Sequence, residues 1–243
     1  SLAIRPGEHV AIVGKSGAGK STLIGLMLGW HRLAFGDLLV DGKPMTSEHQ
    51  EDLRRETAWV DPGIQIWNES FLDNLSYASK DDGLARLGNV IEAATLRGVL
   101  QKLPQGLQTF LGEGGGLVSG GEGQRIRLGR ALMQTGVRLA LLDEPFRGMD
   151  RGQRSALLAD ARQWWQDTTL LCVTHDVSET LPFSRVLVVE DGRIVEDGAP
   201  SQLAAGPSRY RDLLDAESLV REQMWKGKQW RHIQMNNGRI ECA

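Results

Sequence analysis

The chain has little that suits a disulfide-stapled, membrane-spanning or nucleic-acid-binding protein. Its 243 residues include 2 cysteines, Cys172 and Cys242, which lie far apart and lack metal-ligand spacing. Such sparse cysteine is typical of a reducing compartment. No run approaches the roughly 20 apolar residues of a transmembrane helix. The formal net charge of −3 argues against non-specific nucleic-acid binding, which requires a basic surface.

Apolar residues make up 41% of the chain, enough for a sizeable core, and three runs of them read as strands. These runs are Val10–Val13, Leu139–Leu142 and Leu170–Val173. They do not alternate with polar residues, which indicates strands covered on both faces, as in a parallel sheet. Helical patterns near 128–134 and 153–166 lie between them. The sequence therefore predicts an α/β fold with a mostly parallel sheet.

A glycine-rich loop follows the first predicted strand. Residues 14–21 read Gly-Lys-Ser-Gly-Ala-Gly-Lys-Ser, the G-x-x-x-x-G-K-S/T pattern of a phosphate-binding loop, and a helical pattern follows. Backbone N–H groups in such a loop, with the helix N-terminus, form an anion site. Lys20 is expected to reach the β- and γ-phosphates and Ser21 to bind Mg²⁺. The alternative, a chance glycine-rich turn, does not explain the strand–loop–helix context.

The residues expected to contact ATP in this loop are Gly14, Lys15, Ser16, Gly17, Ala18, Gly19, Lys20, Ser21 and Thr22.

Polar residues end the two later apolar strands. Asp143 and Glu144 follow Leu139–Leu142, and His175 follows Leu170–Val173 and Thr174. A carboxylate at such a strand end can hold Mg²⁺ beside the phosphate loop, which suits Asp143. Glu144 is then placed to activate water as a general base, and His175 to hold the water and the base. The alternatives are a capping carboxylate pair and a structural histidine.

Other segments have simpler predictions. Residues 186–195 read as a hairpin with an Asp-Gly turn, and the broken pattern of 46–117 indicates an inserted, mostly helical subdomain. Ser1–Ile4 reads as a strand end. Ser208 is expected to cap a helix, and residues 230–242 to form a small hairpin.

Together with Ser119-Gly120-Gly121-Glu122, these motifs resemble the ATP-binding cassette family, the motor domains of ABC transporters. The family signature is written LSGGQ and stands here as Val118–Glu122. The resemblance covers about residues 1–215 and implies a P-loop NTPase core. It also implies a small antiparallel β element and a helical subdomain, roughly 65–135, that carries the signature. Residues 216–243 would be a C-terminal extension.

The resemblance also implies roles for individual residues. Lys20 and Ser21 match the phosphate-loop lysine and the Mg²⁺ serine, Asp143 the metal-holding aspartate, Glu144 the catalytic glutamate and His175 the switch histidine. In this family the signature covers ATP bound by a second cassette, so that two cassettes form a head-to-tail dimer. The residues with this implied role are Ser119, Gly120, Gly121 and Glu122, with Asp150 in the loop through which the cassettes touch.

The segment Leu111–Gly116 is similar to a glycine-glutamate element of exporter-type cassettes. We therefore expect ATP hydrolysis that drives export. The partners would be a second nucleotide-binding domain and a transmembrane domain fused upstream of Ser1, with a soluble motor at the cytoplasmic face of a membrane and no nucleic acid bound. The cargo and the choice between homodimer and heterodimer remain open. A soluble family member without a membrane domain is the alternative, which the glycine-glutamate element and the acidity oppose.

Three departures from the family pattern are visible. Pro62 stands where the resemblance places the Mg²⁺-sensing glutamine, and Gln65 lies three residues on. Glu122 replaces the last signature glutamine, and the adenine-stacking aromatic would lie before Ser1. The lost glutamine favours a further alternative, a degenerate cassette that binds ATP but hydrolyses little. The intact Glu144 and His175 oppose it.

Overall fold

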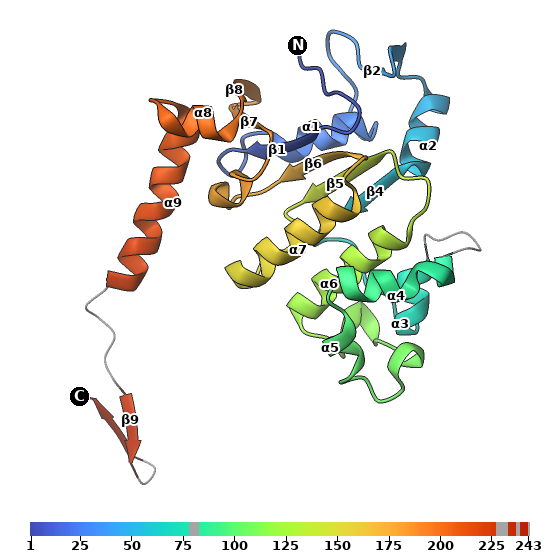
Figure 1. The fold of residues 1–243 in the computed structure, drawn as a ribbon, viewed down its shortest axis with the longest axis vertical. Helices are drawn as coiled ribbons and strands as arrows, with labels where there is room; N and C mark the ends of the chain where they lie inside the picture. The colour runs from blue at the N-terminus through green and yellow to red at the C-terminus, as the bar shows by residue number, and fades with distance from the viewer. Residues whose placement is uncertain (78–82, 227–232, 237–238, 243) are drawn as a thin grey trace.

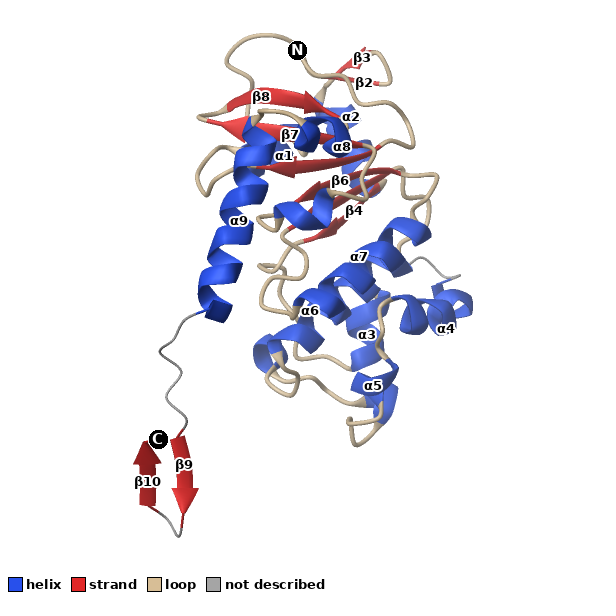
Figure 2. Ribbon diagram, turned by 60° about the vertical axis from the view of Figure 1, so that its left-hand side comes forward, coloured by secondary structure: helices blue, strands red, loops and turns tan. Residues whose placement is uncertain are grey.

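The centre of the molecule is a six-stranded sheet, seen in a computed structural model that describes residues 1–77, 83–226, 233–236 and 239–242 (Figures 1 and 2). In spatial order its strands are β4 (Thr57–Val60), β5 (Leu139–Asp143), β6 (Thr169–Val173), β1 (His9–Val13), β7 (Arg185–Glu190) and β8 (Arg193–Gly198). Neighbours from β4 to β7 are parallel, and β8 is antiparallel to β7. The predicted parallel sheet and the hairpin are both confirmed.

Both faces of the sheet are buried, as the unbroken apolar runs predicted. Side chains of β1 alternate between two core clusters, with Ala11 and Val13 in one and Val10 and Ile12 in the other. Ile24 of α1 (Lys20–Met27) belongs to the second cluster. Helices therefore cover the sheet on both sides, and the strand ends are left free to carry polar residues.

The remaining helices fall into two groups. Around the sheet are α2 (Ser47–Arg55), α7 (Arg151–Trp164), α8 (Pro200–Ala205) and α9 (Arg209–Lys226). Below it in Figure 1 lies a lobe of α3 (Phe71–Ser76), α4 (Gly83–Ala93), α5 (Arg97–Leu100) and α6 (Gly120–Met133). These four helices lie within the range 65–135 that the resemblance implied for a helical subdomain. The wider helical stretch expected at 46–117 is wrong at its start, because Thr57–Val60 form a strand of the central sheet and α2 lies beside that sheet.

A buried arginine ties the lobe together. Arg130 of α6 donates to the Asn74 carbonyl at 2.7 Å, to Asn74 Oδ1 at 2.9 Å and to the Gln65 carbonyl at 3.0 Å. Its guanidinium lies 4.1 Å from the centre of the Trp67 ring. Burial lowers its pKa to about 10. These bonds fix the segment after β4 against α6.

The chain ends differ in part from the sequence prediction. Ser1–Ile4 is not a strand: Leu2 and Ile4 pack on the core edge, but no described strand pairs with their backbone. The Ser208 hydroxyl accepts a hydrogen bond from Arg211 N–H at 2.9 Å, which confirms the predicted cap of α9.

Two small antiparallel sheets complete the fold, β2 (Leu39–Val40) with β3 (Lys43–Pro44) and β9 (Ile233–Asn236) with β10 (Arg239–Cys242). The second is the pairing predicted for the tail, whose positions 230–232 and 237–238 lie outside the described residues.

Candidate functional site

The phosphate loop, residues 14–19, joins β1 to α1 and is shaped by a distant hairpin. A Cβ on Gly14 would lie 2.2 Å from the carbonyl oxygen of Val189, at the end of β7, so no other residue fits there. Gly192, in the turn between β7 and β8, donates from its N–H to the Ala18 carbonyl at 2.9 Å. Asp191 and Gly192 have φ of +47° and +74°, as a two-residue hairpin turn of this kind requires. The β7–β8 turn thus braces the loop.

Lys20, in the first turn of α1, has its ammonium inside this loop. Nζ donates to the Gly14 carbonyl at 2.8 Å and to the Lys15 carbonyl at 2.9 Å, and the residue is 5% exposed. Burial lowers the pKa of Lys20, while the carboxylates of Glu144 and Asp143 oppose that shift. The ammonium therefore lies close to both acidic side chains predicted for the site.

Asp143 ends β5, and its carboxylate is hydrogen-bonded by the Ser21 hydroxyl. Burial raises the pKa of Asp143, and the nearby carboxylates of Asp61 and Glu144 raise it further, against Ser21 and Lys20. The Asp143 carboxylate thus lies in a buried place near other carboxylates, where a bound cation would stabilise its charged form.

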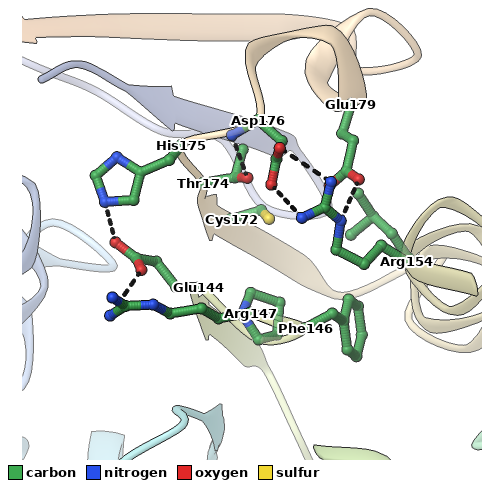
Figure 3. A pocket seen from close by; sticks show the side chains of 11 residues that line it. Glu144, Phe146, Arg147, Arg154, Cys172, Thr174, His175, Asp176 and Glu179 are labelled. Carbon is green, nitrogen blue, oxygen red and sulfur yellow. Dashed lines mark hydrogen bonds and ion pairs between the residues drawn. The ribbon is translucent and has the colours of Figure 1, made fainter. Parts of the chain in front are cut away.

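Glu144 turns away from the strand with φ of +46°, a left-handed conformation that is uncommon for a residue with a side chain. Its N–H still bonds the Val173 carbonyl at 2.9 Å. His175 Nε2 contacts Glu144 Oε1 directly, and Arg147 lies 3.8 Å from Oε2 (Figure 3). The two residues predicted as base and switch therefore meet. Sequence reasoning missed Arg147, although its i+3 spacing from Glu144 was available.

A cavity of about 190 Å³ opens beside this pair (Figure 3). Its lining includes Glu144, His175, Cys172 and Arg154. Cys172 is buried, and burial raises the pKa of its thiol well above the usual range. It is therefore a packing residue of β6.

The signature residues lie away from this edge. Ser119 caps α6, and Gly120, Gly121 and Glu122 form its first turn, in the lobe below the sheet in Figure 1. The Ser119 hydroxyl accepts from Glu122 N–H at 3.3 Å, and Glu122 Oε2 accepts from Ser119 N–H at 2.9 Å, a capping box. Asp150 likewise caps α7 by accepting from Gln153 N–H at 3.0 Å.

The four signature residues thus form the N-terminus of α6. The phosphate loop lies instead at the strand ends, with Asp143, Glu144 and His175.

Glu122 has a partner that the sequence did not reveal. Lys102 Nζ donates to Glu122 Oε1 at 2.7 Å. The pKa of Glu122 is lowered to about 2, chiefly by the hydrogen bond from Lys102 and next by the hydrogen bonds with Ser119. A carboxyl group whose pKa is lowered by folding stabilises the fold at pH values above its ordinary pKa of about 4.3. That stability is lost as the pH falls toward the lowered pKa.

The variant Glu122→Gln is therefore expected to be less stable than the native chain at pH 7, by about 0.5–1 kcal/mol. The difference should shrink below about pH 4.3 and vanish near pH 2. Gln keeps the capping box, so the change isolates the charge. Urea unfolding at several pH values measures the gap, with Glu51→Gln in the exposed pair with Arg55 as control. A gap that does not change with pH would contradict the assignment.

Pro62 follows β4 beside this site, and Gln65 is exposed with its carbonyl bonded by Arg130. Directly before Pro62, Asp61 accepts a hydrogen bond from Gly63 N–H at 2.5 Å. The nearest carboxylate that this loop offers to Asp143 is thus Asp61, one residue before Pro62.

Comparison with known proteins bears on the family and the fold. The family model described as ABC transporter matches residues 1–147. The chain belongs to this family. Its similarity to a bacterial Atm1-family ABC exporter, solved with ATP bound, has a TM-score of 0.82 with 28% identity over 88% of this chain and 37% of that one. The fold is that of an ABC-type nucleotide-binding domain.

Two curated relatives of this ABC chain are similar over most of its length. An ATP-dependent lipid A-core flippase of Haemophilus ducreyi is 33% identical over 88% of this chain and 37% of its own length. The glutathione/L-cysteine transport system ATP-binding/permease protein CydC of Escherichia coli is 33% identical over 86% of this chain and 36% of its own length. The chain therefore spans little more than a third of these relatives. Within the described ranges, no helix has the length and apolarity needed to cross a bilayer.

Proposed function

We propose that this ABC domain binds Mg·ATP at the phosphate loop and hydrolyses it. The observation that carries the proposal is the direct contact of His175 with Glu144, at the strand ends where the Lys20 ammonium also lies. In this mechanism Lys20 exchanges its loop carbonyls for phosphate oxygens. Glu144 takes a proton from the attacking water, and His175 holds the Glu144 carboxylate in place.

The residues present also fit Mg²⁺. Asp143 and Ser21 offer a carboxylate and a hydroxyl oxygen, the hard donors that Mg²⁺ prefers. The raised pKa of Asp143 indicates a carboxylate whose charge its surroundings do not fully compensate. When bound, Mg²⁺ would neutralise charge on the phosphates. We propose that residues 14–22, which comprise the phosphate loop and the first residues of α1, hold ATP.

The first turn of α6 is proposed to act on a second cassette. Its N-terminus offers N–H donors and a positive dipole end to an anion. A Cβ on Gly120 would have no neighbour within 4 Å, and a Cβ on Gly121 would lie 3.5 Å from Met149 Cγ. The space around Gly120 would therefore let a partner's nucleotide approach. We propose a head-to-tail dimer, of identical or different cassettes, in which Ser119–Glu122 cover the ATP of the partner and Asp150 lies in the contact.

The relatives suggest what this ATPase would drive. Both curated relatives are named for transport, and the solved neighbour is an exporter. We propose that residues 1–215, with the helical subdomain at roughly 65–135, form the motor of an exporter at the cytoplasmic face of a membrane. The motor would work with a transmembrane domain, and residues 216–243 would be an extension.

Pro62 supports a second candidate, a cassette that binds ATP but turns over slowly. Proline has neither a side-chain oxygen for the metal nor a backbone N–H. Steady-state phosphate release by the native chain separates the two functions, because only the slow cassette would bind Mg·ATP without sustained turnover.

The dimer can be tested by complementation between two inactive chains. Lys20→Ala removes the phosphate contact, and Gly120→Asp adds a negative charge where the partner's phosphates would lie, in open space that the fold tolerates. Each variant alone should release little phosphate. A mixture should recover up to about a quarter of native turnover, because half of the randomly formed dimers contain one intact site out of two.

The control is Gly120→Ala, which adds bulk without charge in the same open space. Native turnover in Gly120→Asp alone, or no recovery on mixing, would contradict a site shared between cassettes.

A further inference from the structure

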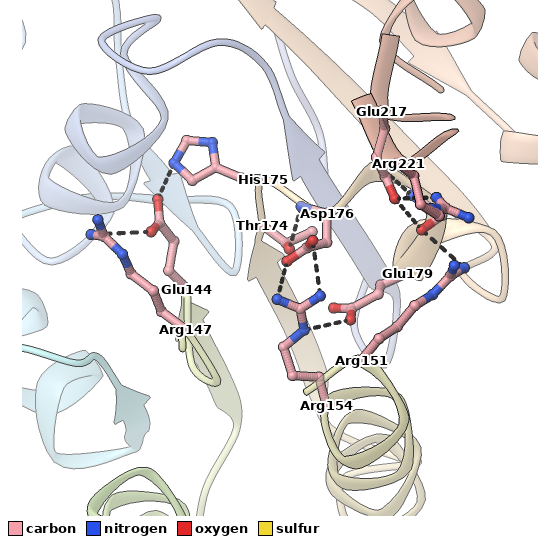
Figure 4. A network of polar contacts seen from close by, with 11 residues as sticks. Glu144, Arg147, Arg151, Arg154, Thr174, His175, Asp176, Glu179, Glu217 and Arg221 are labelled. Carbon is pink, nitrogen blue, oxygen red and sulfur yellow. Dashed lines mark hydrogen bonds and ion pairs between the residues drawn. The ribbon is translucent and has the colours of Figure 1, made fainter. Parts of the chain in front are cut away.

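The short segment after His175 is held from two sides. It comprises Asp176 and the single turn Val177–Thr180, which we call the switch segment. Figure 4 shows α7 on one side and α9 on the other. The contact of His175 with Glu144 lies apart from these bonds and is connected to them through the backbone from His175 to Asp176. The segment links the proposed catalytic pair to the C-terminal helix.

On the side of α9, one carboxylate bonds both the backbone and the side chain of Ser178. Glu217 Oε2 accepts from Ser178 N–H at 2.9 Å, and Oε1 accepts from the Ser178 hydroxyl at 2.6 Å. Arg221, one turn further on, donates to the same Oε1 at 2.9 Å and keeps the carboxylate in place. A third hydrogen bond to α9 joins the Thr180 and Tyr210 hydroxyls at 2.8 Å, and both residues are fully buried.

On the side of α7, Arg154 donates to Asp176 at 3.0 Å and to Glu179 at 3.0 Å. Arg151 reaches the Ser178 hydroxyl at 3.2 Å. Burial raises the pKa of Glu179, and Arg154 opposes that shift. The switch segment is thus hydrogen-bonded to α7 through Asp176 and Glu179 and to α9 through Thr180, and Ser178 contacts both helices.

His175 depends on this backbone for its position. Its side chain is 44% exposed, so packing does little to hold it. Its ring contacts the Glu144 carboxylate. Asp176 N–H donates to the Thr174 hydroxyl at 3.0 Å, which turns the chain directly after the ring. The position of the imidazole relative to Glu144 therefore depends on the backbone conformation of the switch segment.

We propose that Glu217 is a positioning residue: by holding Ser178, it lets α9 fix the backbone that presents His175 to Glu144. This inference rests on the proposed hydrolytic function. It gives α9, which lies beyond the residues matched by the family model, a part in turnover rather than in stability alone.

The test compares Glu217→Ala with Asp215→Ala. Asp215 pairs with Arg211 at 2.9 Å with i,i+4 spacing, as Glu217 pairs with Arg221, but it is exposed and does not bond the switch segment. Glu217→Ala should lower kcat about tenfold or more, because a small misplacement of a catalytic group is costly. The KM and the Kd for Mg·ATP should stay within about twofold, since the phosphate loop is untouched. Asp215→Ala should behave as native.

Two further variants guard against a simple loss of folding. Glu217→Gln keeps one oxygen for Ser178 and should restore part of kcat. Ser178→Ala removes the hydroxyl bond but keeps the N–H, and should be intermediate. A fall in kcat that runs parallel to a fall in Tm across all four variants, or equal kcat in the two alanine variants, would overturn the proposal.

A readout independent of turnover is the ring resonance of His175, one of 5 histidines, assigned by its loss in His175→Ala. It should shift in Glu217→Ala and not in Asp215→Ala, even if the native chain hydrolyses no ATP. A shift of the His175 resonance in Glu217→Ala, with no ATP hydrolysis by the native chain, would contradict the proposed function but support the positioning role of Glu217. Hydrolysis by the native chain, with no such shift, would contradict the positioning role alone.

Discussion

Glu144→Gln is expected to bind Mg·ATP as tightly as the native chain and to hydrolyse it about 10²–10⁴ times more slowly. Glutamine keeps the size and the hydrogen bond to His175 but cannot take a proton from water. Lys20 and the loop carbonyls that hold it are unchanged. Phosphate release under saturating ATP and equilibrium binding of a fluorescent ATP analogue measure the two effects separately.

The matched control is Glu56→Gln, at a partly exposed carboxylate paired with Arg138 far from the strand ends of the site. It should leave both quantities unchanged. Turnover of Glu144→Gln within a few fold of native would mean that another group is the base.

Lys20→Ala should instead abolish tight nucleotide binding, raising the Kd by about 100-fold, because charge-assisted bonds to phosphate are lost. The free chain should lose little stability. The buried ammonium costs desolvation, as its lowered pKa shows, and its removal offsets the two lost carbonyl bonds. Calorimetric titration with Mg·ATP and thermal unfolding without nucleotide measure both.

Lys43→Ala, at an exposed lysine of β3, is the control for a general effect of charge. Retained tight binding in Lys20→Ala would undo the role proposed for the lysine. A collapse of Tm would mean that Lys20 chiefly holds the loop together.

Local patterns were enough to predict the sheet and the position of the loop. Val10–Val13 and the glycines that follow indicate a buried strand and a phosphate loop within a dozen residues. Asp143 ends a second strand and Glu144 follows it directly. Parallel strands bring their ends to one edge, so the meeting of Glu144 with His175 followed from topology.

Contacts between residues far apart in the sequence were not predictable in the same way. Lys102 reaches Glu122 across 20 positions, and Glu217 reaches Ser178 across 39. Lys102 lies in a turn after α5 and Glu217 on the surface of α9, and at such positions a solvated side chain and one with a specific partner give the same local pattern. The error at Ser1–Ile4 has a related cause, because apolar residues alone do not supply a neighbouring strand.

The hairpin that braces the phosphate loop has a consequence for biosynthesis. Gly14 and Ala18 leave the ribosome well before Val189 and Gly192, the residues that confine and hydrogen-bond them. Domains form as units during synthesis, so a nascent chain that ends before β7 carries the complete motif without its final shape. We therefore expect nucleotide to stabilise this loop only after the hairpin has been made, so that a chain stalled before β7 would rely on chaperones rather than on ATP.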